Sequence, residues 1–148
     1  MIQRYVLGFM FSEDLEYVLL VNKKKPAWQC GLLNGIGGKI EEEESEFDAI
    51  RREVFEEAGL KTYNSDWKYF AYLHSKSPVE GIISMMCSRS DKYMARYFSK
   101  TNERIGVYNT KLFRNLRIIP NLNWLIPMAK NALNGKERSK RINIFESL

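Results

Sequence analysis

Acidic side chains crowd one short stretch of this chain, residues 38–60, which reads GKIEEEESEFDAIRREVFEEAGL. Carboxylates this close together repel one another unless cations lie among them. The cations are either solvent ions and neighbouring arginines, or a bound divalent metal. The stretch contains Glu44, Glu46, Glu53, Glu56 and Glu57, the arginine pair Arg51 and Arg52, and Gly59, and it is preceded by Gly37.

This stretch contains signals for both the start and the end of a helix, and together they predict a helix over residues 46–58. Ser45 is a good N-cap, and Asp48 follows it by three residues, in the capping-box position. Gly59 followed by the apolar Leu60 is a typical C-terminal stop.

One side of the predicted helix is apolar, and the glutamates lie beside that side. At about 100° per residue, Glu53, Glu56 and Glu57 project next to the apolar stripe rather than opposite it. Carboxylates at the margin of a buried face can converge on one point. The stripe consists of Phe47, Ile50, Val54 and Ala58.

Two interpretations of the acidic stretch differ in their chemistry. The first is a solvated helix with local ion pairs, such as Arg52 with Glu56 one turn later. The second follows from a longer pattern, which resembles the Nudix box of the Nudix hydrolase superfamily with every defining position filled. The pattern is Gly38, five residues, Glu44, seven residues, Arg52-Glu53, the apolar Val54, one residue, Glu56-Glu57, one residue, Gly59 and the apolar Leu60.

The resemblance implies a metal-dependent hydrolase, with roles for five residues of this chain. Glu56 and Glu57 would bind Mg²⁺ or Mn²⁺, because these cations prefer oxygen ligands. Glu53 would bind a second metal or act as the general base towards the attacking water. Arg52 would hold a neighbouring glutamate in place, and the carbonyl of Gly37 would be a further metal ligand.

Relatives in this superfamily take one more acidic ligand from the second half of the chain. Glu103 occupies the matching place, in a loop ahead of a predicted strand. Asp91 is the alternative candidate, and either residue could instead be an ordinary loop acid.

The segment 28–38, with LNGIGGK at residues 33–39, is similar to the MutT-type branch that hydrolyses purine nucleoside triphosphates, including oxidised ones. In relatives the amide at the position of Asn34 reads the base, which suits a group with one acceptor and two donors. The alternative is a turn residue before Gly35. Asn121 lies where relatives place a base-reading Asn or Asp, although the paired aspartates of one mammalian-type subgroup are absent here.

Other substrate contacts have an ordinary surface or core interpretation beside the functional one. Lys23 and Lys39 are either phosphate partners or solubilising lysines. Trp28 either stacks on a base or wedges its loop against the core, and we favour the wedge. At helical spacing Trp124 is expected in the core, and His74 is expected to be structural.

Composition agrees with the compact enzyme that the resemblance implies, and it predicts no membrane span. The chain has 148 residues, 45% of them hydrophobic, and a net charge of +5 despite the acidic helix. Positive charge is concentrated at residues 23–25 and 136–141. With no signal peptide or apolar run of eighteen residues, we expect one Nudix domain, residues 1–148, in the cytoplasm. Cys30 and Cys87 are expected to be reduced thiols.

The remaining patterns predict an α/β protein, and the resemblance implies an α/β/α sandwich with a mixed β-sheet around the loop-helix-loop of the box. A second helix over 122–133 contains Pro127, which would bend it or shift its start. The strands are expected at 4–11, 16–21, 67–73, 81–87 and, more weakly, 106–112 and 141–145.

The sequence therefore predicts Mg²⁺-dependent hydrolysis of a nucleoside diphosphate linked to another moiety. The first expectation is a purine nucleoside triphosphate cleaved to monophosphate and pyrophosphate. One alternative is a dinucleotide such as ADP-ribose, FAD or a diadenosine polyphosphate, which needs a second nucleotide pocket. The other is a non-catalytic nucleotide- or RNA-binding module. We expect a small-molecule substrate, no nucleic acid, and a monomer or homodimer.

Overall fold

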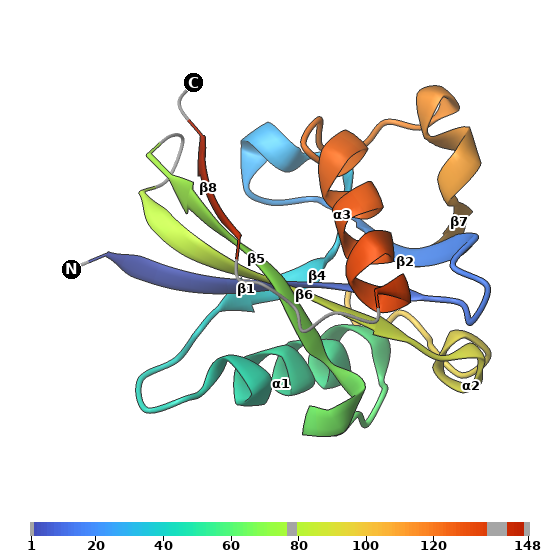
Figure 1. Ribbon diagram of the computed structural model, residues 1–148, viewed down its shortest axis with the longest axis horizontal. Helices are drawn as coiled ribbons and strands as arrows, with labels where there is room; N and C mark the ends of the chain where they lie inside the picture. Colours follow the sequence, from blue (N-terminus) through green and yellow to red (C-terminus); the bar gives the residue numbers. More distant parts are fainter. Residues whose placement is uncertain (1, 77–79, 136–141, 147–148) are drawn as a thin grey trace.

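A mixed β-sheet lies between two helices in the computed structural model, which describes residues 2–76, 80–135 and 142–146 (Figure 1). Helix α1 covers one face of the sheet and α3 the other, as the predicted α/β/α sandwich requires. No helix among the described residues is long and apolar enough to cross a membrane. The helices are α1 (Glu46–Ala58), α2 (Asp91–Met94) and α3 (Leu122–Asn134).

The sheet has strand order β3-β2-β1-β6-β5-β8, with β4 paired to β1 and β7 paired to β2. The β1/β6 and β5/β8 pairs are parallel and the others antiparallel, so the sheet is mixed. The strands are β1 (Gln3–Phe11), β2 (Tyr17–Asn22), β3 (Leu33–Asn34), β4 (Ile36–Lys39), β5 (Lys68–Ser75), β6 (Gly81–Arg89), β7 (Ile105–Asn109) and β8 (Asn143–Glu146).

Alternation along β1 divides the core into two clusters, because successive side chains of a strand point to opposite faces. Val6 and Met10 pack with the apolar stripe of α1, whereas Phe9 and Phe11 pack with α3. Ile50, Val54 and Ala58 of the predicted stripe are fully buried. Phe47, the fourth member, is half-buried against Tyr69. Cys30 and Cys87 are free, as expected.

One predicted strand ends earlier than expected, whereas the helix predicted at 122–133 and the C-terminal strand are both observed, as α3 and β8. The strand expected to reach residue 112 ends at Asn109, whose side chain accepts the Lys111 N–H at 2.9 Å and starts a 3-10 helix, Thr110–Asn115. Helix α3 starts at Leu122 and continues through Pro127, so the proline does not shift its start. Of the strand predicted at 141–145, residue 141 lies outside the described residues, as does the basic run 136–141.

Trp124 is wrong as a core residue, because 36% of it is exposed. At about 100° per residue, Trp124 lies roughly opposite the stripe of Leu122, Leu125 and Ile126, all of which are buried. His74 has the structural role expected of it. Its ring stacks on Phe145 of β8 at 4.5 Å between centroids.

Candidate active site

Helix α1 has the predicted ends, and they fix the direction in which it presents its acids. Ser45 Oγ accepts the Asp48 N–H at 3.0 Å, and Asp48 Oδ2 accepts the Ser45 N–H at 3.1 Å, so the capping box is complete. Gly59 ends the helix at φ 66°, in the left-handed region that a glycine adopts without strain.

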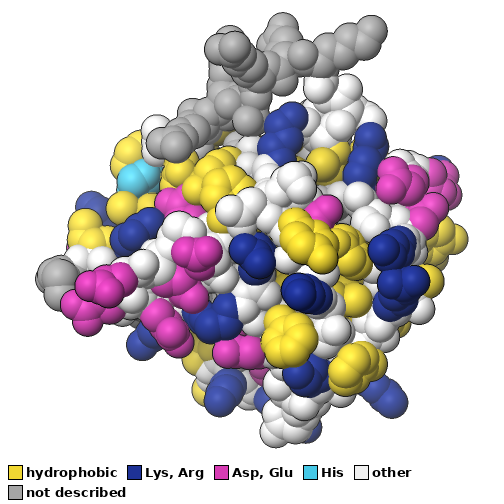
Figure 2. Space-filling model, turned by 90° about the horizontal axis from the view of Figure 1, so that it is seen from below, with side chains coloured by type: hydrophobic (Ala, Val, Ile, Leu, Met, Phe, Trp, Pro, Cys, Tyr) yellow, Lys and Arg dark blue, Asp and Glu magenta, His cyan; other side chains and the backbone are white. Residues whose placement is uncertain are grey.

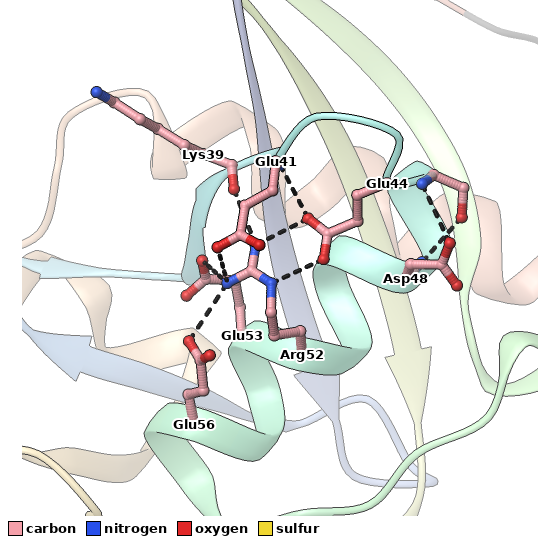
Figure 3. A network of polar contacts seen from close by, with 8 residues as sticks. Lys39, Glu41, Glu44, Asp48, Arg52, Glu53 and Glu56 are labelled. Carbon is pink, nitrogen blue, oxygen red and sulfur yellow. Dashed lines mark hydrogen bonds and ion pairs between the residues drawn. The ribbon is translucent and has the colours of Figure 1, made fainter.

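Arg52 is the centre of the carboxylate network on this helix (Figure 3). It binds Glu44 twice, through Nε at 2.7 Å and Nη2 at 2.9 Å. Nη1 donates to Glu53 at 2.8 Å and to Glu56 at 3.3 Å, and Nη2 also donates to the Lys39 carbonyl at 3.0 Å. The bond to Glu44 raises the pKa of Arg52, so the guanidinium stays charged, and it lowers the pKa of Glu44.

Glu53 lies between Arg52 and the backbone of Gly38. A methyl group in place of the Gly38 hydrogen would come within 2.8 Å of Glu53 Cδ, so a larger residue at this position would displace the carboxylate. Burial raises the pKa of Glu53, and the Arg52 hydrogen bond acts against that rise. A carboxylate with a raised pKa, held by a fixed arginine, is suited to accept a proton from water.

Glu57 is buried, with 9% of its surface exposed. Burial is the main cause that raises its pKa to about 8, and Glu53 and Glu103 add to the rise, while Lys23 and the Gly37 N–H act against it. Its Oε2 is buried without a hydrogen-bond partner. An unpaired buried carboxylate oxygen is costly, and a divalent cation would satisfy it. The donor set therefore fits a metal ion.

The predicted convergence of Glu53, Glu56 and Glu57 on one point is only partly observed. Glu53 and Glu56 share the Arg52 Nη1 atom, and the Glu56 side chain is 54% exposed. Within residues 2–76, 80–135 and 142–146, no three carboxylate, imidazole or thiolate groups form a ready-made metal cage. Mg²⁺ does not need one, because it usually keeps several waters and takes one or two carboxylates together with substrate phosphates.

Glu103 lies close to this region, but its carboxylate is engaged elsewhere. It is 7% exposed, and it accepts Lys23 Nζ at 3.2 Å and the Lys24 N–H at 2.7 Å. Burial alone would raise the pKa of Glu103, but these donors hold it below its usual value. Asp91, the alternative candidate, starts α2 and accepts the Glu13 N–H at 2.8 Å.

A cavity of about 790 Å³ adjoins the carboxylates, and every predicted substrate residue lines it. They come from separate segments: the loop after β2, strands β3 and β4, and the start of α3. The glycine pair also lines the cavity, and the same glycines contact Glu53 and Glu57. The predicted residues along the cavity are Lys23, Trp28, Asn34, Gly37, Lys39 and Asn121.

The two asparagines differ in how free their amides are. Asn34 Oδ1 accepts the Gly35 N–H at 2.8 Å, and Nδ2 donates to Gln29 at 3.2 Å, so Asn34 serves its own turn as well as lining the cavity. Asn121 Oδ1 is buried and has no hydrogen-bond partner. The open acceptor suits a donor on a bound base.

Trp28, Lys23 and Lys39 all line the cavity, but their side chains have different surroundings. The core-wedge interpretation of Trp28 is wrong, because 48% of the residue is exposed in a 3-10 helix (Ala27–Gln29) that buries no residue. Lys23 lies in the ion pair with Glu103. The Lys39 side chain points away from the carboxylate network in Figure 3.

Sequence reasoning missed the floor of the cavity, which is the sheet itself. Strands β5 and β6 contribute alternate positions, the period-2 signal of one sheet face, whereas β1 contributes the consecutive residues 5–7. That signal was present in the strands, but it does not indicate that the cavity lies on the face of the sheet covered by α3. The floor and wall residues not predicted are Tyr5, Val6, Leu7, Pro26, Gln29, Gly35, Gly38, Leu73, Ser75, Gly81, Ile83, Met85, Ile119 and Pro120.

Solved structures resemble this fold at low sequence identity. A MutT structure, from work on Aliivibrio salmonicida and Vibrio cholerae, matches with TM-score 0.70 and 19% identity over 87% of this chain and 97% of that one. The NUDIX domain of Shewanella oneidensis NrtR, complexed with ADP ribose, matches with TM-score 0.74 and 16% identity over 90% of both chains.

A bifunctional NMN adenylyltransferase/ADP ribose pyrophosphatase from Francisella tularensis, complexed with AMP and a Mn ion, matches with TM-score 0.67 and 16% identity. The match covers 86% of this chain and 41% of that one. No curated protein sequence matches the chain significantly. The family model of the NUDIX domain matches residues 1–129. The chain therefore belongs to the NUDIX domain family and is a pyrophosphohydrolase of the Nudix type.

Proposed function

We propose that the protein is a Mg²⁺-dependent hydrolase of nucleoside diphosphates linked to another moiety, with a purine nucleoside triphosphate as its preferred substrate. The observation that carries the proposal is the glycine pair. Gly37 and Gly38 line the cavity on one side and contact Glu57 and Glu53 on the other. A nucleotide in the cavity would therefore place its phosphates beside the carboxylates.

The metal, when bound, neutralises charge on the phosphate oxygens and activates water. Glu57 is the principal ligand in this proposal, with the Gly37 carbonyl beside it and Glu56 joining from the surface. Glu103, which the sequence also suggested as a ligand, is not part of the metal set in this proposal, because its two oxygens accept hydrogen bonds from residues 23–25. Glu53 accepts the proton of the attacking water, while Arg52 fixes its orientation through the 2.8 Å bond.

The base and the phosphates have separate partners in the cavity. Asn121 and Asn34 would read the base edge, and Trp28 would stack on its face. Lys23 and Lys39 would contact the phosphates. The cavity volume of about 790 Å³ lies in the usual range for small-molecule sites.

A dinucleotide is the second candidate, because ADP ribose is bound by the NrtR domain and named in the pyrophosphatase activity of the Francisella protein. The two candidates give different products. A triphosphate yields pyrophosphate, whereas ADP ribose yields AMP and ribose phosphate. The single-domain organisation, Mg²⁺ in preference to Mn²⁺, the cytoplasmic location and the monomer or homodimer state stay predictions.

A substrate panel with one variant and one matched control tests the proposal. Purified protein is given canonical, oxidised and dinucleotide substrates with Mg²⁺ or Mn²⁺, and the products are identified. Glu53→Gln should lower kcat by roughly 10²–10⁴-fold. Glu42→Gln, the same change at an exposed residue that the box pattern leaves unspecified, should leave kcat unchanged. Retention of full turnover by Glu53→Gln would refute the assigned role.

A further inference from the structure

The loop between β2 and β3, residues 23–32, forms one rim of the cavity but is weakly packed. Its ends are joined by backbone bonds, Lys23 N to Leu32 O at 2.9 Å and Gly31 N to Lys23 O at 2.8 Å. Residues 24–28 are all exposed, and Trp28 within them lines the cavity. Burial therefore contributes little to holding this outer arm, and polar anchors must do so.

Glu103 is the main polar anchor of that arm. Its Oε2 accepts the N–H groups of Lys24 at 2.7 Å and Lys25 at 3.4 Å, and its Oε1 accepts Lys23 Nζ at 3.2 Å. The carboxylate is almost fully buried, which strengthens charge-assisted bonds of this kind. Three consecutive residues of the rim thus depend on one side chain that is distant in the sequence.

The anchor is itself held in place by its neighbours. Thr101 Oγ1 accepts the Glu103 N–H at 3.1 Å, and Ser99 Oγ accepts the Ile105 N–H at 2.9 Å. The same segment joins the end of α1, where the Lys100 N–H donates to the Glu57 carbonyl at 3.1 Å. The rim and the catalytic helix are therefore connected through residues 99–105.

We propose that Glu103 is a positioning residue for substrate binding, which acts by holding the rim loop so that Lys23 and Trp28 face the nucleotide. Because each of its oxygens accepts a hydrogen bond from the loop, we expect its loss to weaken substrate binding, measured as KM, rather than metal affinity. This inference rests on the proposed function, because it needs a nucleotide in the cavity.

Glu103→Ala tests the role in three measurements. We expect KM for the best nucleotide to rise about tenfold or more, with kcat and the Mn²⁺ dissociation constant changed less than about threefold. Amide hydrogen exchange at Lys24 and Lys25 should accelerate, while exchange within α1 stays slow. The KM and the loop exchange rates of Glu103→Gln should lie between those of the unsubstituted protein and Glu103→Ala, because the carbonyl oxygen of the glutamine still accepts the Lys24 N–H.

Two further variants separate positioning from general damage. Asp66→Ala removes another carboxylate that accepts a backbone N–H, that of Tyr63 at 2.7 Å, and it should leave KM and loop exchange unchanged. Thr101→Val should produce a weaker form of the Glu103→Ala effect, whereas Thr101→Ser keeps the hydroxyl and should behave as the unsubstituted protein.

Two results would overturn the inference. One is a Mn²⁺ affinity more than about tenfold weaker in Glu103→Ala with KM unchanged, which would make Glu103 a metal ligand. The other is unchanged exchange at Lys24 and Lys25. If these amides do exchange faster but the unsubstituted protein hydrolyses no nucleotide, the loop anchor stands and the proposed function fails, because exchange is measured without substrate.

Discussion

At the scale of single residues, backbone space decides where the catalytic carboxylates lie. A side chain at Gly37 would meet the Val6 carbonyl, which is rigid backbone, whereas one at Gly38 would meet the movable Glu53 carboxylate. The two adjacent glycines therefore serve different purposes. Gly37 lets β4 pack against β1, and Gly38 leaves room for the general base.

Alanine substitutions at the two glycines should have different effects, one on kcat and the other on the unfolding free energy. Gly38→Ala should displace the Glu53 carboxylate and lower kcat about tenfold or more, with little change in unfolding free energy. Gly37→Ala should lower the unfolding free energy by roughly 2 kcal/mol or more, because backbone cannot move aside. Urea unfolding and steady-state kinetics of both variants measure this. Equal losses of stability would contradict the distinction.

The raised pKa of the buried Glu57 should make the unfolding free energy depend on pH. Its folded-state pKa of about 8 exceeds the ordinary 4.5, so between these values the folded state holds more protons than the unfolded state. The unfolding free energy of the metal-free protein therefore falls as the pH rises from about 4.5 to 8. Above pH 8 the stabilising contribution of protonated Glu57 is fully lost.

Replacing Glu57 by Gln should remove that dependence at the expense of activity. In EDTA at pH 8.5, Glu57→Gln should be more stable than the unsubstituted protein by on the order of 1–3 kcal/mol, because no charge is buried. Urea unfolding from pH 5 to pH 9 measures both profiles. Glu42→Gln is the control and should keep the original slope. Parallel profiles for Glu57→Gln would show that Glu57 is not the titrating group.

At the scale of elements, α1 is fixed at both ends by partners that do not take part in the chemistry. The capping box holds its start, and backbone donors from residues 98 and 100 satisfy the carbonyls of Ala58 and Glu57 at its end. Because helices end with unsatisfied backbone groups, these partners set the axial position of the helix. The acids three and four residues apart then keep their spacing.

Removal of the N-cap should cost stability and leave the reaction intact. Ser45→Ala loses the 3.0 Å bond to the Asp48 N–H and should lower the unfolding free energy by about 1 kcal/mol. Ser45→Asp keeps an acceptor and should restore most of it. Thermal unfolding and kcat are the measurements. A large fall in kcat for Ser45→Ala would mean that the cap also orients the acids.

At the scale of the whole molecule, β8 forms one edge of the sheet. Figure 2 shows one face of the molecule, on which Asp and Glu form a group at the left and a second one at the upper right, while Lys and Arg are spread between and around them. The net charge of +5 is thus compatible with an acidic catalytic helix. Strand β8 pairs with β5 at the sheet edge, and Ile144 packs against the core.

Deletion of residues 136–148 should destabilise the protein. Without β8 the outer edge of β5 is unpaired, and exposed edges promote association. We expect the unfolding free energy to fall by roughly 1–3 kcal/mol, and light scattering to increase. Phe145→Ala, which removes only the stack on His74, should have a smaller effect. A truncated protein as stable and soluble as the full chain would show that β8 is dispensable.

The sequence by itself was enough to predict helix α1, both of its ends and membership of the Nudix family, because all three depend on interactions between residues close together in the chain. The helix caps, the repeat of apolar residues and the box pattern are all contained in roughly twenty consecutive residues. None of them depends on a residue elsewhere in the chain. Only the tertiary structure decided that Arg52 also binds the Lys39 carbonyl, that Trp28 is exposed, and that Glu103 holds a loop 80 residues away. These outcomes depend on which segments the sheet brings together, and spacing along the chain does not contain that information.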